Sequence, residues 1–69
     1  MKKAVATFFE GDRVEVGLGM YGENIHYGRV IRVEFTNGGY NVIYLVRYDN
    51  GEMGYVYDTN MKLINNGTI

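Results

Sequence analysis

Short runs of alternating apolar and polar residues recur along the chain, and glycine-containing turns separate them. The clearest pair of runs flanks Asn50-Gly51 and predicts a β-hairpin. Because Asn-Gly tolerates the positive φ angles of a type I′ turn, we expect a two-residue turn that pairs Asp49 with Glu52. Strands are predicted at residues 13–16, 25–35, 41–48, 52–57 and 62–64.

The second of these strands is the longest and should bend. Gly28 lies inside it, and the alternation breaks at Val30-Ile31. Such a break is typical of a strand that passes from one half of a small barrel to the other. A single 3₁₀ turn is predicted at residues 58–61, just before the last strand.

Residues 17–24 contain three glycines around Leu18, Met20 and Tyr21, which disfavours a helix. We therefore predict a loop whose tip is apolar. Exposed apolar residues in a loop indicate a contact surface. The alternative is that Leu18 and Met20 fold back and cap the end of the barrel.

Length and composition favour one small β domain. The chain has 69 residues, of which 46% are hydrophobic, with ten glycines and seven tyrosines. We assign residues 11–64 to the domain and 65–69 to a C-terminal tail. Residues 1–10 form an N-terminal arm or edge strand that packs Phe8 and Phe9 onto the domain.

Composition and charge also exclude some functions. With no cysteine and one histidine, neither disulfides nor a Cys/His zinc site is expected, and we predict no cofactor and no metal. The net charge of −1 is not the strong positive field of a protein held by phosphate contacts. No membrane segment is predicted, and the apolar run after Lys3 is too short for a secretion signal. We expect a cytoplasmic monomer or homodimer.

The order of these segments resembles the SH3-like barrel, in particular its Tudor and KOW branches. The resemblance covers most of residues 11–64. It is found in Gly11-Asp12-Arg13-Val14-Glu15-Val16, Tyr27-Gly28-Arg29-Val30-Ile31, the stretch from Tyr44 to Glu52, Tyr55-Val56 and Leu63-Ile64. It implies an all-β, five-stranded, SH3-like (Tudor-like) barrel with a short 3₁₀ turn before the last strand.

The Tudor resemblance implies an aromatic cage that holds a methylated lysine or arginine. The corresponding positions are Tyr21, Tyr27 and Tyr48, and Tyr57 lies within reach with Asp49 and Glu52. The chain departs from the pattern because it has no tryptophan and carries Asn50-Gly51 in the hairpin turn. The alternative is that these tyrosines pack across strands and only stabilise the sheet.

We therefore predict a non-enzymatic binding module that docks a protein partner through a tyrosine-rich face and the 17–24 loop. The small size and the absence of cysteine and proline are typical of a bacterial or phage protein, such as a phage-encoded inhibitor or accessory factor. The predicted partner-binding residues are Tyr21, Tyr27, Tyr48, Tyr57, Leu18 and Met20.

Two alternatives remain open. The first is nucleic-acid binding, as in KOW domains, through Arg29, Arg32 and Arg47 with tyrosines for base stacking. A regular strand would place Arg29 and Arg32 on opposite faces. The second is the plasmid-encoded dihydrofolate reductase of the SH3-like type. Its Val-Gln-Ile-Tyr motif is similar to Gly54-Tyr55-Val56-Tyr57, but a tyrosine replaces the glutamine that contacts both ligands.

Overall fold

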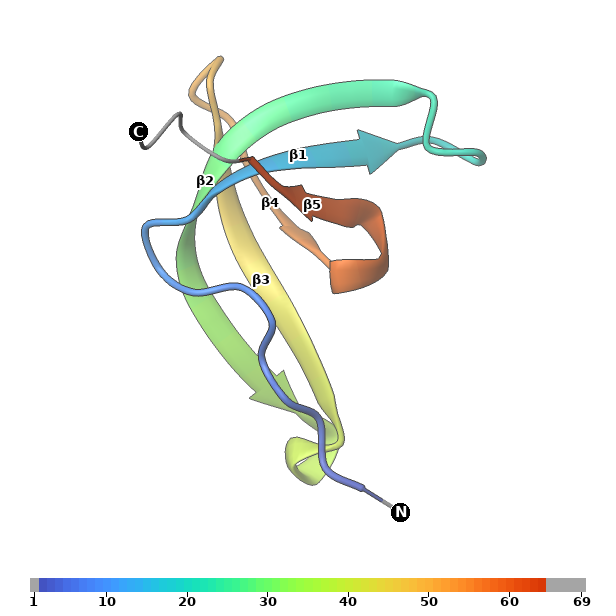
Figure 1. Ribbon diagram of the computed structural model, residues 1–69, viewed down its shortest axis with the longest axis vertical. Coiled ribbons are helices and arrows are strands. Elements are labelled where there is room, and N and C mark those ends of the chain that lie inside the picture. Colours follow the sequence, from blue (N-terminus) through green and yellow to red (C-terminus); the bar gives the residue numbers. More distant parts are fainter. Residues whose placement is uncertain (1, 65–69) are drawn as a thin grey trace.

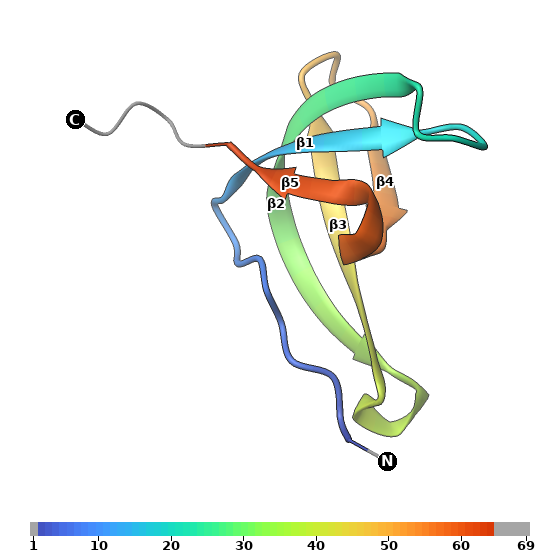
Figure 2. The ribbon, with the colours of Figure 1, turned by 45° about the vertical axis from the view of Figure 1, so that its right-hand side comes forward.

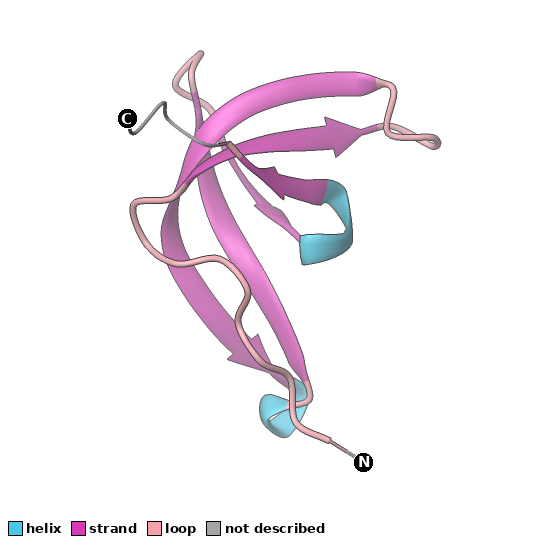
Figure 3. Cartoon of the chain, viewed as in Figure 1, coloured by secondary structure: helices cyan, strands magenta, loops and turns pink. Residues whose placement is uncertain are grey.

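The computed structural model of the protein describes residues 2–64, which form five antiparallel strands and two short 3₁₀ turns (Figures 1 and 3). The elements are β1 (Arg13–Leu18), β2 (Asn24–Thr36), η1 (Asn37–Gly39), β3 (Asn41–Tyr48), β4 (Met53–Val56), η2 (Asp58–Asn60) and β5 (Met61–Leu63). The prediction of an all-β chain with five strands and a 3₁₀ turn before the last one is confirmed. The predicted tail, residues 65–69, lies outside the described residues.

The strands form one sheet in the order β4-β3-β2-β1-β5. The long β2 pairs with β1 along its first half and with β3 along its second half. Strands β4 and β5 stand at the two ends of this order and do not pair with each other. The structure therefore contains an open, strongly curved sheet (Figure 2) rather than the closed barrel that the sequence predicts.

A β-bulge bends β2 where the alternation breaks in the sequence. Val30 pairs with Val46, but the next pair joins Arg32 to Leu45, so that Ile31 is an extra residue without a partner in β3. The prediction of an irregularity at Val30-Ile31 is confirmed.

The hairpin between β3 and β4 has a different turn from the predicted one. The Gly51 N–H donates to the Tyr48 carbonyl at 2.9 Å, and the Tyr48 N–H donates to the Glu52 carbonyl at 2.7 Å. Three residues, 49–51, thus form the loop, and only Gly51 among them has a positive φ. The expected pairing of Asp49 with Glu52 is wrong by one residue. The observed register directs Gly54 and Val56 toward the core, and Tyr55 toward the opposite face.

One face of the sheet, the core face, holds the hydrophobic core. Its fully buried side chains are Val14, Val16, Val30, Tyr44 and Val46. We call the opposite side the outer face.

The N-terminal arm, residues 2–10, contains no strand and runs beside β2 and β3 (Figure 1). Phe8 packs edge-on against Tyr44, with ring centroids 5.4 Å apart, while Phe9 is exposed. The Thr7 N–H donates to the Tyr44 hydroxyl at 2.9 Å. The arm therefore covers the core and gives the buried hydroxyl of Tyr44 a hydrogen bond.

Replacing Gly28 with alanine should destabilise the fold by about 2 kcal/mol because there is no room for a methyl group. A Cβ at Gly28 would lie 2.5 Å from the Arg47 carbonyl oxygen and 2.7 Å from a methyl group of Val46. At Gly54, the nearest atom would be a ring carbon of Tyr48, 3.5 Å away, which is an ordinary contact. Urea denaturation of Gly28→Ala and of the control Gly54→Ala would measure both effects. Equal stabilities would contradict this packing.

Candidate functional site

A pocket of about 480 Å³ opens at one end of the sheet, between the β1–β2 loop (residues 19–23) and η2. The loop contributes Met20 and Tyr21, and the 3₁₀ turn contributes Thr59 and Asn60. Glu15, Gly17, Ile25, Met61 and Lys62 also line this pocket, together with Gly19 and Gly22. The side chains on the lining therefore combine apolar surface with one acidic and one basic group.

Hydrogen bonds hold both walls of this pocket. The Asn60 side-chain amide donates to the Gly17 carbonyl at 3.0 Å, which joins η2 to β1. The Tyr21 N–H donates to a carboxylate oxygen of Glu23 at 3.0 Å, and Gly19 and Gly22 provide the positive φ angles of the tight loop. Met20 and Tyr21 nevertheless remain 85% and 87% exposed. The loop thus presents two large side chains to solvent on a defined backbone.

The other predicted docking residues lie in different environments. Leu18 packs against the core, so it takes the alternative role considered from the sequence, whereas Met20 does not fold back. Tyr57 is exposed and lines a second pocket of about 280 Å³ beside the N-terminal arm. Tyr27 lies on the outer face and is half exposed.

Tyr48 cannot join Tyr27 in one cage. Tyr48 pairs with Gly28, so its ring lies on the core face, and Tyr27 points to the outer face. Tyr48 is only 9% exposed, and its ring covers Gly54 and contacts the ring of His26 in a tilted arrangement, with centroids 5.5 Å apart. Burial also raises the pKa of its hydroxyl. The cage positions implied by the Tudor resemblance are therefore not assembled as one site.

The three predicted arginines share one face. The extra residue Ile31 shifts the alternation of β2, so Arg32 lies on the outer face together with Arg29. The expectation that they lie on opposite faces is wrong because it assumed a regular strand. Arg47 is the direct partner of Arg29 in β3, and Arg13 is its direct partner in β1. The result is a row of three arginines, Arg13, Arg29 and Arg47, across three strands, with Arg32 on the same face.

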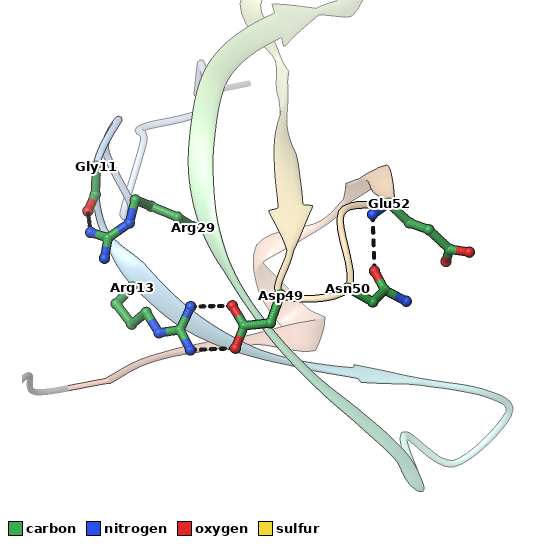
Figure 4. Close-up of polar contacts among 6 residues, drawn as sticks. All are labelled: Gly11, Arg13, Arg29, Asp49, Asn50 and Glu52. Atoms are coloured by element: carbon green, nitrogen blue, oxygen red, sulfur yellow. Dashed lines mark hydrogen bonds and ion pairs between the residues drawn. The ribbon is translucent and has the colours of Figure 1, made fainter.

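The positive charge of these four arginines is partly neutralised. Arg13 forms two parallel hydrogen bonds of 2.5 Å with the carboxylate of Asp49 (Figure 4). Arg29 donates to the Gly11 carbonyl at 2.7 Å. Arg32 lies 3.4 Å from Glu34, and Arg47 makes no ion pair within residues 2–64. Of the arginines on the outer face, Arg29 and Arg47 thus form no ion pair with a carboxylate within residues 2–64.

The sequence did not indicate the roles of Asn60 and Lys62 at the pocket, or that of Arg13. A predicted 3₁₀ turn before the last strand places Asn60 and Lys62 near each other, but nothing in the sequence sets their distance from residues 19–23. The pairing of Arg13 with Asp49 depends on the register of β3 against β2, in which the Asp49 N–H donates to the Tyr27 carbonyl at 2.9 Å, and the sequence does not set this register.

Within the described residues, no group of three or more His, Asp or Glu side chains could hold a metal ion. In the same part of the chain, no helix is long and apolar enough to cross a membrane. Comparisons with protein-family models, with curated proteins and with solved structures found no match to the chain.

Replacing Asp49 with asparagine should make the protein less sensitive to acid. The hydrogen bonds from Arg13 hold the pKa of Asp49 below its ordinary value of 3.8, and the charge of Arg29 lowers it further. A carboxylate whose pKa is lower in the folded state stabilises the fold above the unfolded pKa, and this contribution is lost as the pH falls toward the folded pKa. Between about pH 5 and about pH 2, the wild-type protein should therefore lose more stability than Asp49→Asn.

The measurement is chemical denaturation across this pH range. Glu10→Gln, which removes an exposed carboxylate outside any ion pair of residues 2–64, serves as the control. Identical pH profiles for the wild type and Asp49→Asn would show that the Arg13–Asp49 pair does not contribute to stability in solution.

Proposed function

We propose that the protein is a non-enzymatic, cytoplasmic binding module of the SH3-like type that docks a protein partner at the pocket between the β1–β2 loop and η2. One observation carries this proposal: Met20 and Tyr21 are almost fully exposed on the lining of a pocket of about 480 Å³. A small domain gains stability by burying such side chains, so their exposure favours a role in binding.

The chemistry of this surface suits a protein partner. Tyrosine combines a large ring, few rotatable bonds and a polar tip, and it is frequent at the centres of interfaces. Methionine adapts its shape to irregular apolar surfaces. Glu15 and Lys62, which are direct partners across β1 and β5, add charged groups to the lining of the pocket. An apolar anchor of the partner with polar neighbours would match this lining.

The arrangement of the strands supports the SH3-like, Tudor-like part of the proposal. The central β2 bends and is shared by two halves of the sheet, and a 3₁₀ turn precedes β5. These are the features that the resemblance implies. With a protein-docking role, the chain would serve as an accessory factor or inhibitor, of phage or bacterial origin.

Tyr21→Ala should weaken partner binding by about 2 kcal/mol, because Tyr21 is the most exposed large side chain on the pocket. Peptides selected on the wild-type protein from a random display library would serve as probes, with affinities measured by isothermal titration calorimetry. Tyr21→Phe tests the hydroxyl alone. Tyr40→Ala is the matched control, since Tyr40 is also exposed but does not line this pocket. Selected peptides that bind Tyr21→Ala as tightly as the wild type would refute the proposed site.

Nucleic-acid binding is a second candidate, because the bulge at Ile31 places Arg29, Arg32 and Arg47 on one face. Half-exposed Tyr27 and Tyr55 lie on the same face and offer rings for stacking.

If this face binds single-stranded DNA, affinity should fall steeply with salt, and Arg47→Ala should reduce the slope of log K against log salt by about one unit. Fluorescence anisotropy with a labelled oligonucleotide at several salt concentrations provides the measurement. Lys2→Ala, a charge change in the N-terminal arm, is the control. Absence of binding at low salt would eliminate this candidate and leave the docking pocket unaffected.

A further inference from the structure

The two edges of the sheet differ in how they are protected. An exposed strand edge invites pairing with another chain, and natural proteins protect it by shortness, charge, proline, a bulge or a covering segment. Strand β5 has only three residues, with Lys62 at its centre. Strand β4, Met53–Val56, has neither charge nor proline, and no bulge interrupts its pairing with β3. With four residues, β4 has only its shortness as protection, so its edge is the less protected of the two.

The register shows which backbone groups face this edge. The hydrogen bond from the Tyr48 N–H to the Glu52 carbonyl makes these two residues a hydrogen-bonded pair. Hydrogen-bonded and non-hydrogen-bonded pairs alternate in an antiparallel ladder, so Met53 and Tyr55 belong to non-hydrogen-bonded pairs. Their N–H and C=O groups consequently point away from β3. No hydrogen bond from these groups to a loop, turn or other element occurs within residues 2–64.

The same two residues provide the side-chain contacts. Met53 and Tyr55 lie on the outer face and are 54% and 53% exposed. The Tyr55 hydroxyl donates to Glu34 at 2.9 Å, which fixes the direction of the ring. Leu45, the partner of Tyr55 in β3, is partly buried beside it. A strand added at the β4 edge would thus satisfy four backbone groups and cover an ordered apolar surface.

The charges around the edge select the partner. Glu52 precedes β4 and Asp58 follows Tyr57, and neither carboxylate belongs to an ion pair among the described residues. The unpaired cation on this face, Arg47, is the partner of Met53 in β3 and therefore lies one strand further from the edge. A second copy that paired its β4 in antiparallel fashion, centred on Tyr55, would bring Glu52 of each copy toward the end of the other copy's β4, where η2 begins with Asp58. Like charges brought together at the ends of a strand pair destabilise it. A strand with basic residues at both ends would instead be attracted.

We propose that the β4 edge binds an extended, apolar protein segment flanked by lysine or arginine, which adds to the sheet as a sixth strand. This surface is separate from the pocket of the β1–β2 loop, so the proposal does not depend on partner docking there.

The test uses synthetic peptides and the full chain. The probe has a centre of alternating valine and threonine with two lysines at each end. A second peptide carries glutamates at the ends, and a third is the lysine peptide with alternate backbone amides N-methylated. We expect amide NMR shifts on β4 with the lysine peptide, and binding at least about tenfold weaker with each of the other two, because each loses charge attraction or hydrogen bonds.

Met53→Pro removes an N–H that faces the edge and leaves the ladder with β3 intact, whereas Met53→Ala removes only the side chain. Met53→Pro should reduce the affinity for the lysine peptide by about tenfold more than Met53→Ala does, because only the proline variant loses a backbone hydrogen bond. The amide spectrum reports whether each variant is folded, and N-methylation of the peptide tests the same bonds without changing the protein.

Three results would overturn the proposal. Equal binding of the lysine and N-methylated peptides would exclude strand addition. Equal binding of the lysine and glutamate peptides would exclude the charge selection. A concentration-dependent dimer in analytical ultracentrifugation that is lost in Met53→Pro would show that a second copy occupies the edge. The two proposals fail separately. Tyr21→Ala changes the pocket and not β4, so this variant should still bind the lysine peptide with the affinity of the wild type.

Discussion

The close approach of β2 and β3 at Gly28 is the constraint on which the rest of the structure depends. At this point β2 pairs with β1 on one side and with β3 on the other. The Arg47 carbonyl and the Val46 side chain occupy the space where a Cβ at position 28 would lie. Because glycine leaves this space free, the backbones can meet closely, and one long strand can belong to both halves of a small sheet. The five fully buried side chains all lie on the core face.

The bulge at Ile31 follows from the same need for curvature and has a consequence for the outer face. A strand that bends sharply between two ladders accommodates an extra residue, and this residue changes which side chains point outward. Arg32 thereby joins Arg29 on the outer face, and Arg47 lies across from Arg29. The core benefits as well, since Val30 and Val33 both contact it from either side of the bulge. The extra residue that bends β2 thus also determines that Arg32 lies on the outer face.

The sequence predicted the positions of the strands better than their register and the faces on which their side chains lie. Alternation located all five strands, and the break at Val30-Ile31 located the bulge, because both are local properties of the chain. The outward direction of Arg32 could not be predicted, since it depends on a single extra residue. The turn at Asn50-Gly51 was predicted one residue too short, because the Asn-Gly pair is compatible with more than one turn. Of the predicted docking residues, Met20 and Tyr21 lie at the pocket, while Tyr48 lies in the core.

The error at the turn matters because register decides which tyrosines are available to a partner. With the predicted pairing, Tyr55 would have stood opposite Val46 on the core face. In the observed pairing Gly54 takes that place, and the ring of Tyr48 covers it. The ring of Tyr48 over Gly54 fills this part of the core. Tyr55 therefore lies on the outer face, where it is half exposed and its hydroxyl donates a hydrogen bond to Glu34. The apolar, uncharged surface of β4 is therefore not needed for the core of this domain. This surface and the free strand edge beside it are what the proposed sixth strand would cover, which is why the register of the hairpin bears directly on that proposal.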